Sequence, residues 1–108
     1  MELMKFDHVA LQSKSISESV EWYLERFGGE VVYQDDTWAE VKVCGLNLAF
    51  VTPGQHPSHV AFSLTEEEAE KFPDKSFKLH RDGTRSFYEK DNQGNILEFI
   101  VRPNAEES

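Results

Sequence analysis

Apolar and polar residues alternate along the first half of the chain in a way that predicts a strand, a helix and three more strands. Residues 6–12 alternate with the period of a strand. A helix is expected from Ser15, whose spacing to Glu18 is that of a capping box, to Gly28, because apolar side chains recur between them at helical spacing. Strands are then predicted over residues 30–33, 37–43 and 46–51.

The second half repeats this order of elements. A strand is expected over residues 59–64 and a short helix over 65–72, which Pro73 ends. Three further strands are predicted over residues 76–80, 85–90 and 96–101.

The amino acids themselves support an internal repeat. His8-Val9-Ala10-Leu11 is matched 51 residues later by His59-Val60-Ala61-Phe62, and residues 45–51 are matched 49 residues later by residues 94–100. At the second offset Trp38 falls on Phe87, Glu40 on Glu89 and Ala49 on Glu98. We therefore expect one α+β domain over residues 1–108, built from two βαβββ modules at about 4–52 and 57–102.

Composition and charge limit the classes of molecule that this protein is expected to bind. The formal net charge is −9, so the surface would repel nucleic acid and acidic membranes, and neither is expected as a partner. No apolar run is long enough to cross a bilayer, the start of the chain lacks a signal-peptide pattern, and the single cysteine, Cys44, excludes a disulfide framework. We expect a cytoplasmic protein in which Cys44 is buried.

Three side chains form a candidate metal-binding set. His8 and His59 open the two repeat halves, and Glu98 stands in the last strand. In each strand the apolar neighbours point to the helices, so all three side chains are expected on the opposite sheet face. Two imidazoles and one carboxylate suit one divalent transition metal (Fe, Mn, Ni, Co or Zn) and leave coordination positions open for substrate or water.

The sequence resembles the vicinal oxygen chelate superfamily of glyoxalases, bleomycin-resistance proteins and extradiol dioxygenases. The resemblance rests on Asp7-His8-Val9-Ala10, on His59-Val60-Ala61-Phe62 and on the closing segment from Phe87 to Glu98. It implies a curved mixed sheet around a cavity with the helices on its outer face. It also implies that His8, His59 and Glu98 are metal ligands, and that two chains form a homodimer around a small-molecule substrate.

Departures from the family pattern bear on the reaction. Glyoxalases carry a fourth ligand where the repeat places Ala49, so a glyoxalase reaction is disfavoured unless a slip in the alignment brings Asn47 there. His80 and the pair Phe87-Tyr88 resemble the extradiol dioxygenase signature. Tyr88, His80 and the loop residue His56 are accordingly the candidate catalytic acids and bases.

Two functions from different classes remain. The first is a metal-dependent enzyme that acts on an oxygen-chelating small molecule, with dioxygenase-like and lyase- or transferase-like reactions both open. The second is a non-catalytic module that binds or sequesters a small molecule, favoured by the acidic charge and by aromatic side chains such as Trp38 and Phe87, which are expected to line or back the cavity.

Overall fold

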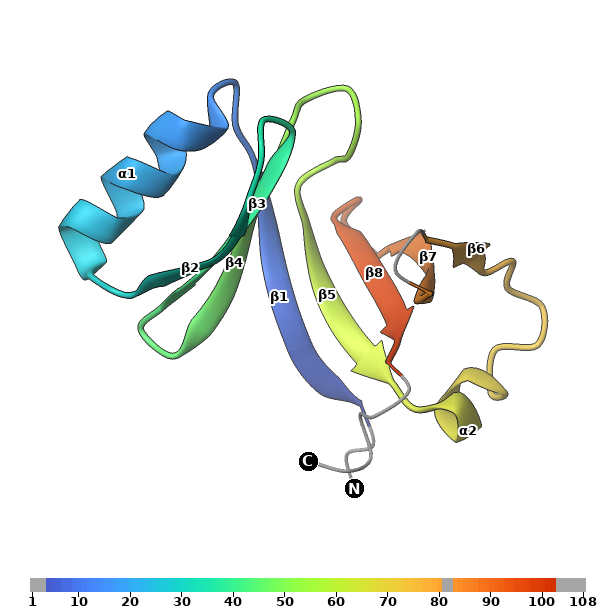
Figure 1. Ribbon diagram of the computed structural model, residues 1–108. Helices are drawn as coiled ribbons and strands as arrows, with labels where there is room; N and C mark the ends of the chain where they lie inside the picture. Colours follow the sequence, from blue (N-terminus) through green and yellow to red (C-terminus); the bar gives the residue numbers. More distant parts are fainter. Residues whose placement is uncertain (1–3, 81–82, 103–108) are drawn as a thin grey trace. The chain divides into compact units, whose positions relative to one another are not determined.

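The computed structural model describes residues 4–80 and 83–102, and within them the order strand, helix and three strands occurs twice (Figure 1). The first pass is β1 (Lys5–Gln12), α1 (Ile16–Phe27), β2 (Glu30–Gln34), β3 (Trp38–Val43) and β4 (Leu46–Val51). The second is β5 (His59–Leu64), α2 (Glu66–Ala69), β6 (Lys78–Leu79), β7 (Arg85–Lys90) and β8 (Ile96–Val101). The eight strands form a mixed sheet in the order β2-β3-β4-β1-β5-β8-β7-β6, which confirms the predicted α+β class.

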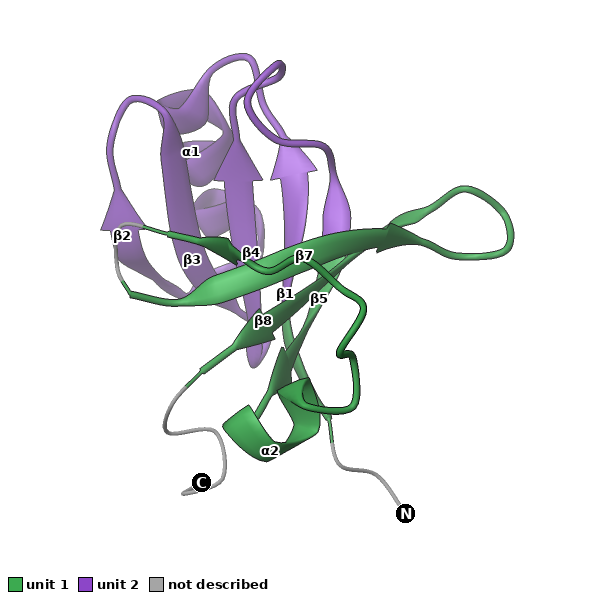
Figure 2. Cartoon of the chain, turned by 90° about the vertical axis from the view of Figure 1, so that its right-hand side faces the viewer, with its two compact units in different colours: residues 1–7, 60–108 green, residues 8–59 purple. Residues whose placement is uncertain are grey.

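The chain divides into two compact units, coloured separately in Figure 2. One unit is residues 8–59, and the other is residues 1–7 together with 60–108. Strand β1 thus begins in one unit and continues in the other.

In the unit of residues 8–59, α1 covers one face of strands β1 to β4. Strand β1 runs parallel to β4, while β2, β3 and β4 are antiparallel neighbours. The core joins Ile16 and Val20 of α1 to alternate residues of the sheet, namely Ala39, Val41, Val43 and Phe50. Strand alternation sends Trp38 to the other face, where it packs on Ala10, Ala49 and Val51.

In the other unit, β5 runs parallel to β8, and β8, β7 and β6 are antiparallel neighbours. A core of apolar side chains lies between these strands and the segment that contains α2; its buried members are Leu64, Ala69, Phe87, Phe99 and Val101. Ser86 and Glu98 alternate with these core residues along β7 and β8, so they lie on the opposite face.

The register of the strands shows that one part of the predicted repeat alignment is right and another part is wrong. Ala10 lies beside Ala49, and Ala61 beside Glu98, which places Ala49 and Glu98 at equivalent positions as the sequence suggested. Across the hairpins, however, Glu40 is opposite Ala49 and Tyr88 is opposite Glu98. The counterpart of Glu40 is therefore Tyr88 rather than Glu89, because the turn between β7 and β8 is longer than the turn between β3 and β4.

Local capping also differs from the sequence prediction. Ser15 caps α1 without a side-chain hydrogen bond, so the expected capping box at Ser15 and Glu18 is absent; the Ser13 hydroxyl instead donates to the Ser15 carbonyl. The complete capping box is at α2, where the Thr65 hydroxyl accepts from Glu68 N–H and Glu68 accepts from Thr65 N–H. Helix α2 is shorter than predicted and ends at Ala69.

The expectation that Cys44 is buried is wrong, because Cys44 lies in the turn between β3 and β4. Cys44 is exposed and has a positive φ of 52°, followed by Gly45 at 76°. Two consecutive positive φ values make the tight connection that suits the twist of a hairpin. No helix among the described residues is long and apolar enough to span a membrane.

Candidate metal site

The two histidines of the candidate site come from β1 and the start of β5. His8 is half-buried and His59 is 7% exposed, and their ring centroids lie 5.5 Å apart at an interplanar angle of 72°. His59 Nδ1 lies 2.8 Å from the carbonyl oxygen of Pro57. Because that oxygen can only accept, Nδ1 carries the proton, and the Nε2 lone pair points away as a metal ligand requires.

The carboxylate comes from the middle of β8. Glu98 is 6% exposed, and its Oε2 accepts a hydrogen bond of 2.9 Å from the Ser86 hydroxyl on β7. The Ser86 oxygen in turn lies 2.7 Å from His80 Nε2. Since a carboxylate accepts and the single hydroxyl hydrogen goes to Glu98, His80 Nε2 must donate to Ser86.

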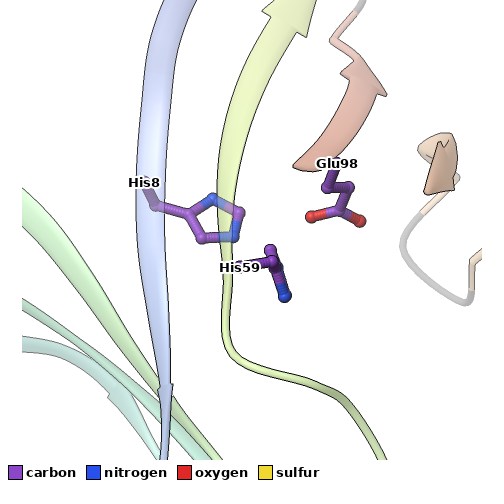
Figure 3. Close-up of side chains that lie close together, drawn as sticks. All are labelled: His8, His59 and Glu98. Carbon is purple, nitrogen blue, oxygen red and sulfur yellow. The ribbon is translucent and has the colours of Figure 1, made fainter. Parts of the chain in front are cut away.

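His8, His59 and Glu98 each offer one ligand atom, and these atoms all lie within 4.8 Å of one another (Figure 3). Two atoms bound to one ion at about 2.0–2.2 Å are at most about 4.4 Å apart, and the limit of 4.8 Å on the separations of these ligand atoms is close to that value. Two neutral imidazole nitrogens and one carboxylate oxygen form a donor set suited to a divalent transition metal with open positions. The residues present therefore fit such an ion.

The other predicted site residues are Tyr88, His56 and His80, and the structure relates each of them to the three candidate ligands in a different way. Tyr88 is directly opposite Glu98 in the β7–β8 pair and so projects from the same face. His56 lies exposed in the loop before β5, where its carbonyl accepts from Gln12 Nε2. His80 is joined to Glu98 through Ser86.

Tyr88 keeps 41% of its surface accessible, and the pKa of its phenol is raised to about 12, chiefly because partial burial disfavours the phenolate and also because of the negative charge on Glu98. We expect the difference in tyrosinate absorbance between the metal-free wild type and Tyr88→Phe to titrate near pH 12. Between about pH 10 and that value the native state holds a proton that the unfolded chain loses, so this contribution to stability declines as the pH rises. A difference that titrates at pH 10 would contradict this environment for Tyr88.

Glu40 is a residue of this face that the sequence reasoning missed. It lies opposite Ala49 and is the structural counterpart of Tyr88, and it is half-buried. Directly opposed residues of antiparallel strands have Cβ atoms about 4.5–5.5 Å apart, so Glu40 supplies a carboxylate beside the position where Ala49 has none. Only the hairpin register reveals this, because the sequence offset aligns Glu40 with Glu89.

The two aromatic residues that we expected to line or back a cavity, Trp38 and Phe87, lie in different clusters of side chains. Trp38 lies on the sheet face away from α1 and stacks on Tyr33, with ring centroids 4.5 Å apart. Phe87 belongs instead to the core beneath the α2 segment, where it stacks on Phe99. Its counterpart in the first hairpin is Ala39, and the counterpart of Trp38 is Ser86, because the repeat offset changes at the turn.

An open polar pocket of about 580 Å³ lies at the start of α1, lined by residues 14–17 and 34–36. None of the candidate metal ligands lines it. One of its walls is the Asp35 turn, where Asp35 accepts from the backbone N–H groups of Thr37 and Trp38 and from the Tyr33 hydroxyl. These hydrogen bonds, with that from Tyr33 the largest influence, hold the pKa of Asp35 well below its usual range.

The family model of the glyoxalase/bleomycin resistance protein/dioxygenase superfamily matches residues 5–99. The chain belongs to this superfamily. The match spans both modules and includes all three candidate ligands. A comparison with curated proteins finds no match.

Solved structures show the same fold. A superfamily member from Vibrio splendidus 12B01 is 14% identical, with a TM-score of 0.66, over 92% of this chain and 99% of that one. A variant of methylmalonyl-CoA epimerase from Streptomyces coelicolor, in complex with 2-nitronate-propionyl-CoA, is 20% identical, with a TM-score of 0.71, over 99% of each chain. Homoprotocatechuate 2,3-dioxygenase from Brevibacterium fuscum is 16% identical, with a TM-score of 0.67, over 94% of this chain and 33% of that one. At these identities the likeness establishes the fold alone.

Proposed function

We propose that this superfamily member is a metal-dependent enzyme that acts on a small molecule through two neighbouring oxygen atoms. The observation that carries the proposal is the convergence of His8, His59 and Glu98, from three different strands, to within 4.8 Å. A bound divalent metal would supply Lewis acidity and orient substrate oxygens at its open positions. The occurrence of an epimerase and a dioxygenase with the same fold supports an enzymatic function without fixing the reaction.

Proton handling in this proposal falls to Tyr88, with Glu40, His80 and His56 as further candidate acids and bases. The raised pKa keeps the Tyr88 phenol protonated near neutral pH, so it would donate a hydrogen bond or proton to a substrate oxygen rather than act as a base. Glu40 lies at the equivalent place in the first module, where a carboxylate could accept a proton. A lyase-, isomerase- or transferase-type reaction would use both groups, whereas an oxygenase would need a redox-active metal such as iron in the site.

The test of this proposal is metal binding by the wild-type protein, purified without a chelator or a metal-affinity tag. We expect about one transition metal per chain by elemental analysis. At a metal concentration about 100 times the Kd, binding stabilises the native state by about 2.7 kcal/mol. That gain should raise the Tm by roughly 10–20 °C in a chain of this size.

A metal-free binding module is the alternative outcome of that experiment. Trp38 and Tyr33 form an aromatic pair on the sheet, and the net charge of −9 favours a cationic ligand. Absence of any Tm change with Fe(II), Mn(II), Ni(II), Co(II) or Zn(II), together with no metal after reconstitution, would reject the enzyme and favour this module.

The assembly proposed is a homodimer. Edge strand β2 exposes Val31, Val32 and Tyr33, with 43%, 56% and 43% of their surfaces accessible. An exposed apolar edge strand is a surface that proteins usually cover. Light scattering after gel filtration would establish the mass in solution, and the cytoplasmic location expected from the sequence stays a prediction.

A further inference from the structure

We propose that Ser86 and His80 are positioning residues for the candidate ligand Glu98, and that they act in series through the chain His80 Nε2–H to Ser86 Oγ–H to Glu98 Oε2. This inference rests on the proposed metal site, which it deepens. The two hydrogen bonds measure 2.7 Å and 2.9 Å. Neither residue offers an atom to the set of three ligands.

Burial of Ser86 and Glu98 increases the effect of the hydrogen bond between them on the carboxylate. Ser86 is 2% exposed and Glu98 is 6% exposed. A buried carboxylate is costly unless its oxygens are hydrogen-bonded or face a cation, and a hydrogen bond to a charged acceptor contributes more than one to a neutral group. With Oε2 held by the serine hydroxyl, rotation of the carboxylate is restricted, and its other oxygen can be presented to a metal in a fixed direction.

His80 determines which way the serine hydroxyl points. A hydroxyl has one hydrogen and can rotate it toward either of two acceptors. Donation from His80 Nε2 occupies the Ser86 oxygen, so the serine hydrogen is directed to Glu98. Backbone hydrogen bonds fix His80 in turn, because its N–H donates to the Thr84 carbonyl and its carbonyl accepts from Gly83 N–H.

The first module supplies an internal comparison. At the position equivalent to Glu98 it has Ala49, and at the position equivalent to Ser86 it has Trp38, which packs against the apolar cluster that contains this alanine. A buried polar pair therefore occurs in the module that carries the candidate carboxylate ligand, and an apolar pair occurs in the module that lacks it. This pattern favours a role for Ser86 in holding Glu98 over a general role of this strand position in the fold.

The test measures Co(II) affinity in metal-free protein, using the visible absorption of the bound ion and competition with a chelator. We expect Ser86→Ala to weaken Co(II) binding by about 10- to 100-fold, as for other groups that orient metal ligands. The matched control is Ser63→Ala. Ser63 is a serine of the same unit and sheet face, 5% exposed, whose hydroxyl lies 3.4 Å from the Lys5 carbonyl instead of a ligand. Its affinity should stay within about twofold of wild type.

Because the two hydrogen bonds act in series, we expect two further results. His80→Ala should weaken binding by up to about tenfold, and His80→Gln, which keeps an N–H donor, should recover most of that loss. Because His80 acts through Ser86, the double variant with Ser86→Ala and His80→Ala should bind no more weakly than Ser86→Ala alone. His80 is half-buried, so its variants test the chain of hydrogen bonds even where Ser86→Ala folds poorly.

Separate outcomes identify which idea fails. If wild type binds one Co(II), Glu98→Ala abolishes binding and Ser86→Ala matches wild type, the positioning role is wrong and the metal site stands. Equal losses in Ser63→Ala and Ser86→Ala, or additive losses in the double variant, would also overturn the positioning role. If wild type binds no Co(II), the metal site itself is wrong, and this inference falls with it.

Discussion

Replacing His59 by alanine is expected to weaken divalent metal binding by more than about 100-fold, because it removes a ligand rather than a group that orients one. His59 is buried, and its Nδ1–H is held by the Pro57 carbonyl, so Nε2 is the atom presented to the ion. Glu98→Ala should cause a loss of the same order. Both variants should lose the metal-dependent rise in Tm, as measured by calorimetry with and without the metal, alongside elemental analysis.

The matched control for these variants is His56→Ala, which removes an imidazole three residues from His59 in the exposed loop. We expect His56→Ala to bind metal as wild type does. If His59→Ala kept one metal per chain, the assignment of His59 as a ligand would be wrong. If His56→Ala lost the metal as well, the loop histidine would be a fourth ligand, a possibility that the open coordination positions allow.

Replacing Gly29 by alanine is expected to lower the free energy of unfolding by about 4 kcal/mol, the largest stability effect that we expect from one substitution. Gly29 joins α1 to β2 at a positive φ of 102°, and a Cβ there would lie 2.1 Å from the carbonyl oxygen of Lys42. Strain in a glycine-only conformation costs about 1–3 kcal/mol, and forcing atoms into a packed site costs about 1–3 kcal/mol more. Because the clashing atom belongs to the backbone of β3, no side-chain rotation relieves it.

Gly28→Ala separates backbone strain from the clash. Gly28 also has a positive φ, of 75°, but a Cβ at that position would meet no atom within 4 Å. We expect Gly28→Ala to cost about 1–2 kcal/mol, from the conformation alone. Urea unfolding monitored by circular dichroism would give both values. Equal costs for the two variants would show that the close approach of β3 to Gly29 does not determine the requirement for glycine.

The sequence determined the elements because each strand and helix follows from short-range periodicity. Alternation in residues 6–12 and helical spacing after Ser15 gave β1 and α1, and their repetition after His59 gave the second module. The same alternation placed His8 and Glu98 on the faces away from the helices. The net charge of −9 also led us to expect neither nucleic acid nor acidic membranes as partners, and this expectation stays a prediction.

Boundaries in the second module were less well predicted. Helix α2 and strand β6 are both shorter than the sequence patterns over 65–72 and 76–80 suggest. Apolar residues near the end of the predicted helix, such as Phe72, enter the core of that unit without continuing the helix. Burial of an aromatic side chain depends on its tertiary neighbours, so periodicity alone does not locate the end of the element.

What only the tertiary structure decided is which residues face one another across the hairpins. Register depends on the length of each turn, and the turn between β7 and β8 is longer than that between β3 and β4, so a constant repeat offset misaligns Glu40 and Trp38. The hydrogen bonds from His80 through Ser86 to Glu98 link residues that no local pattern connects. Periodicity reports which face a side chain occupies, whereas a site needs the position along neighbouring strands, and that position is fixed only when the strands pair.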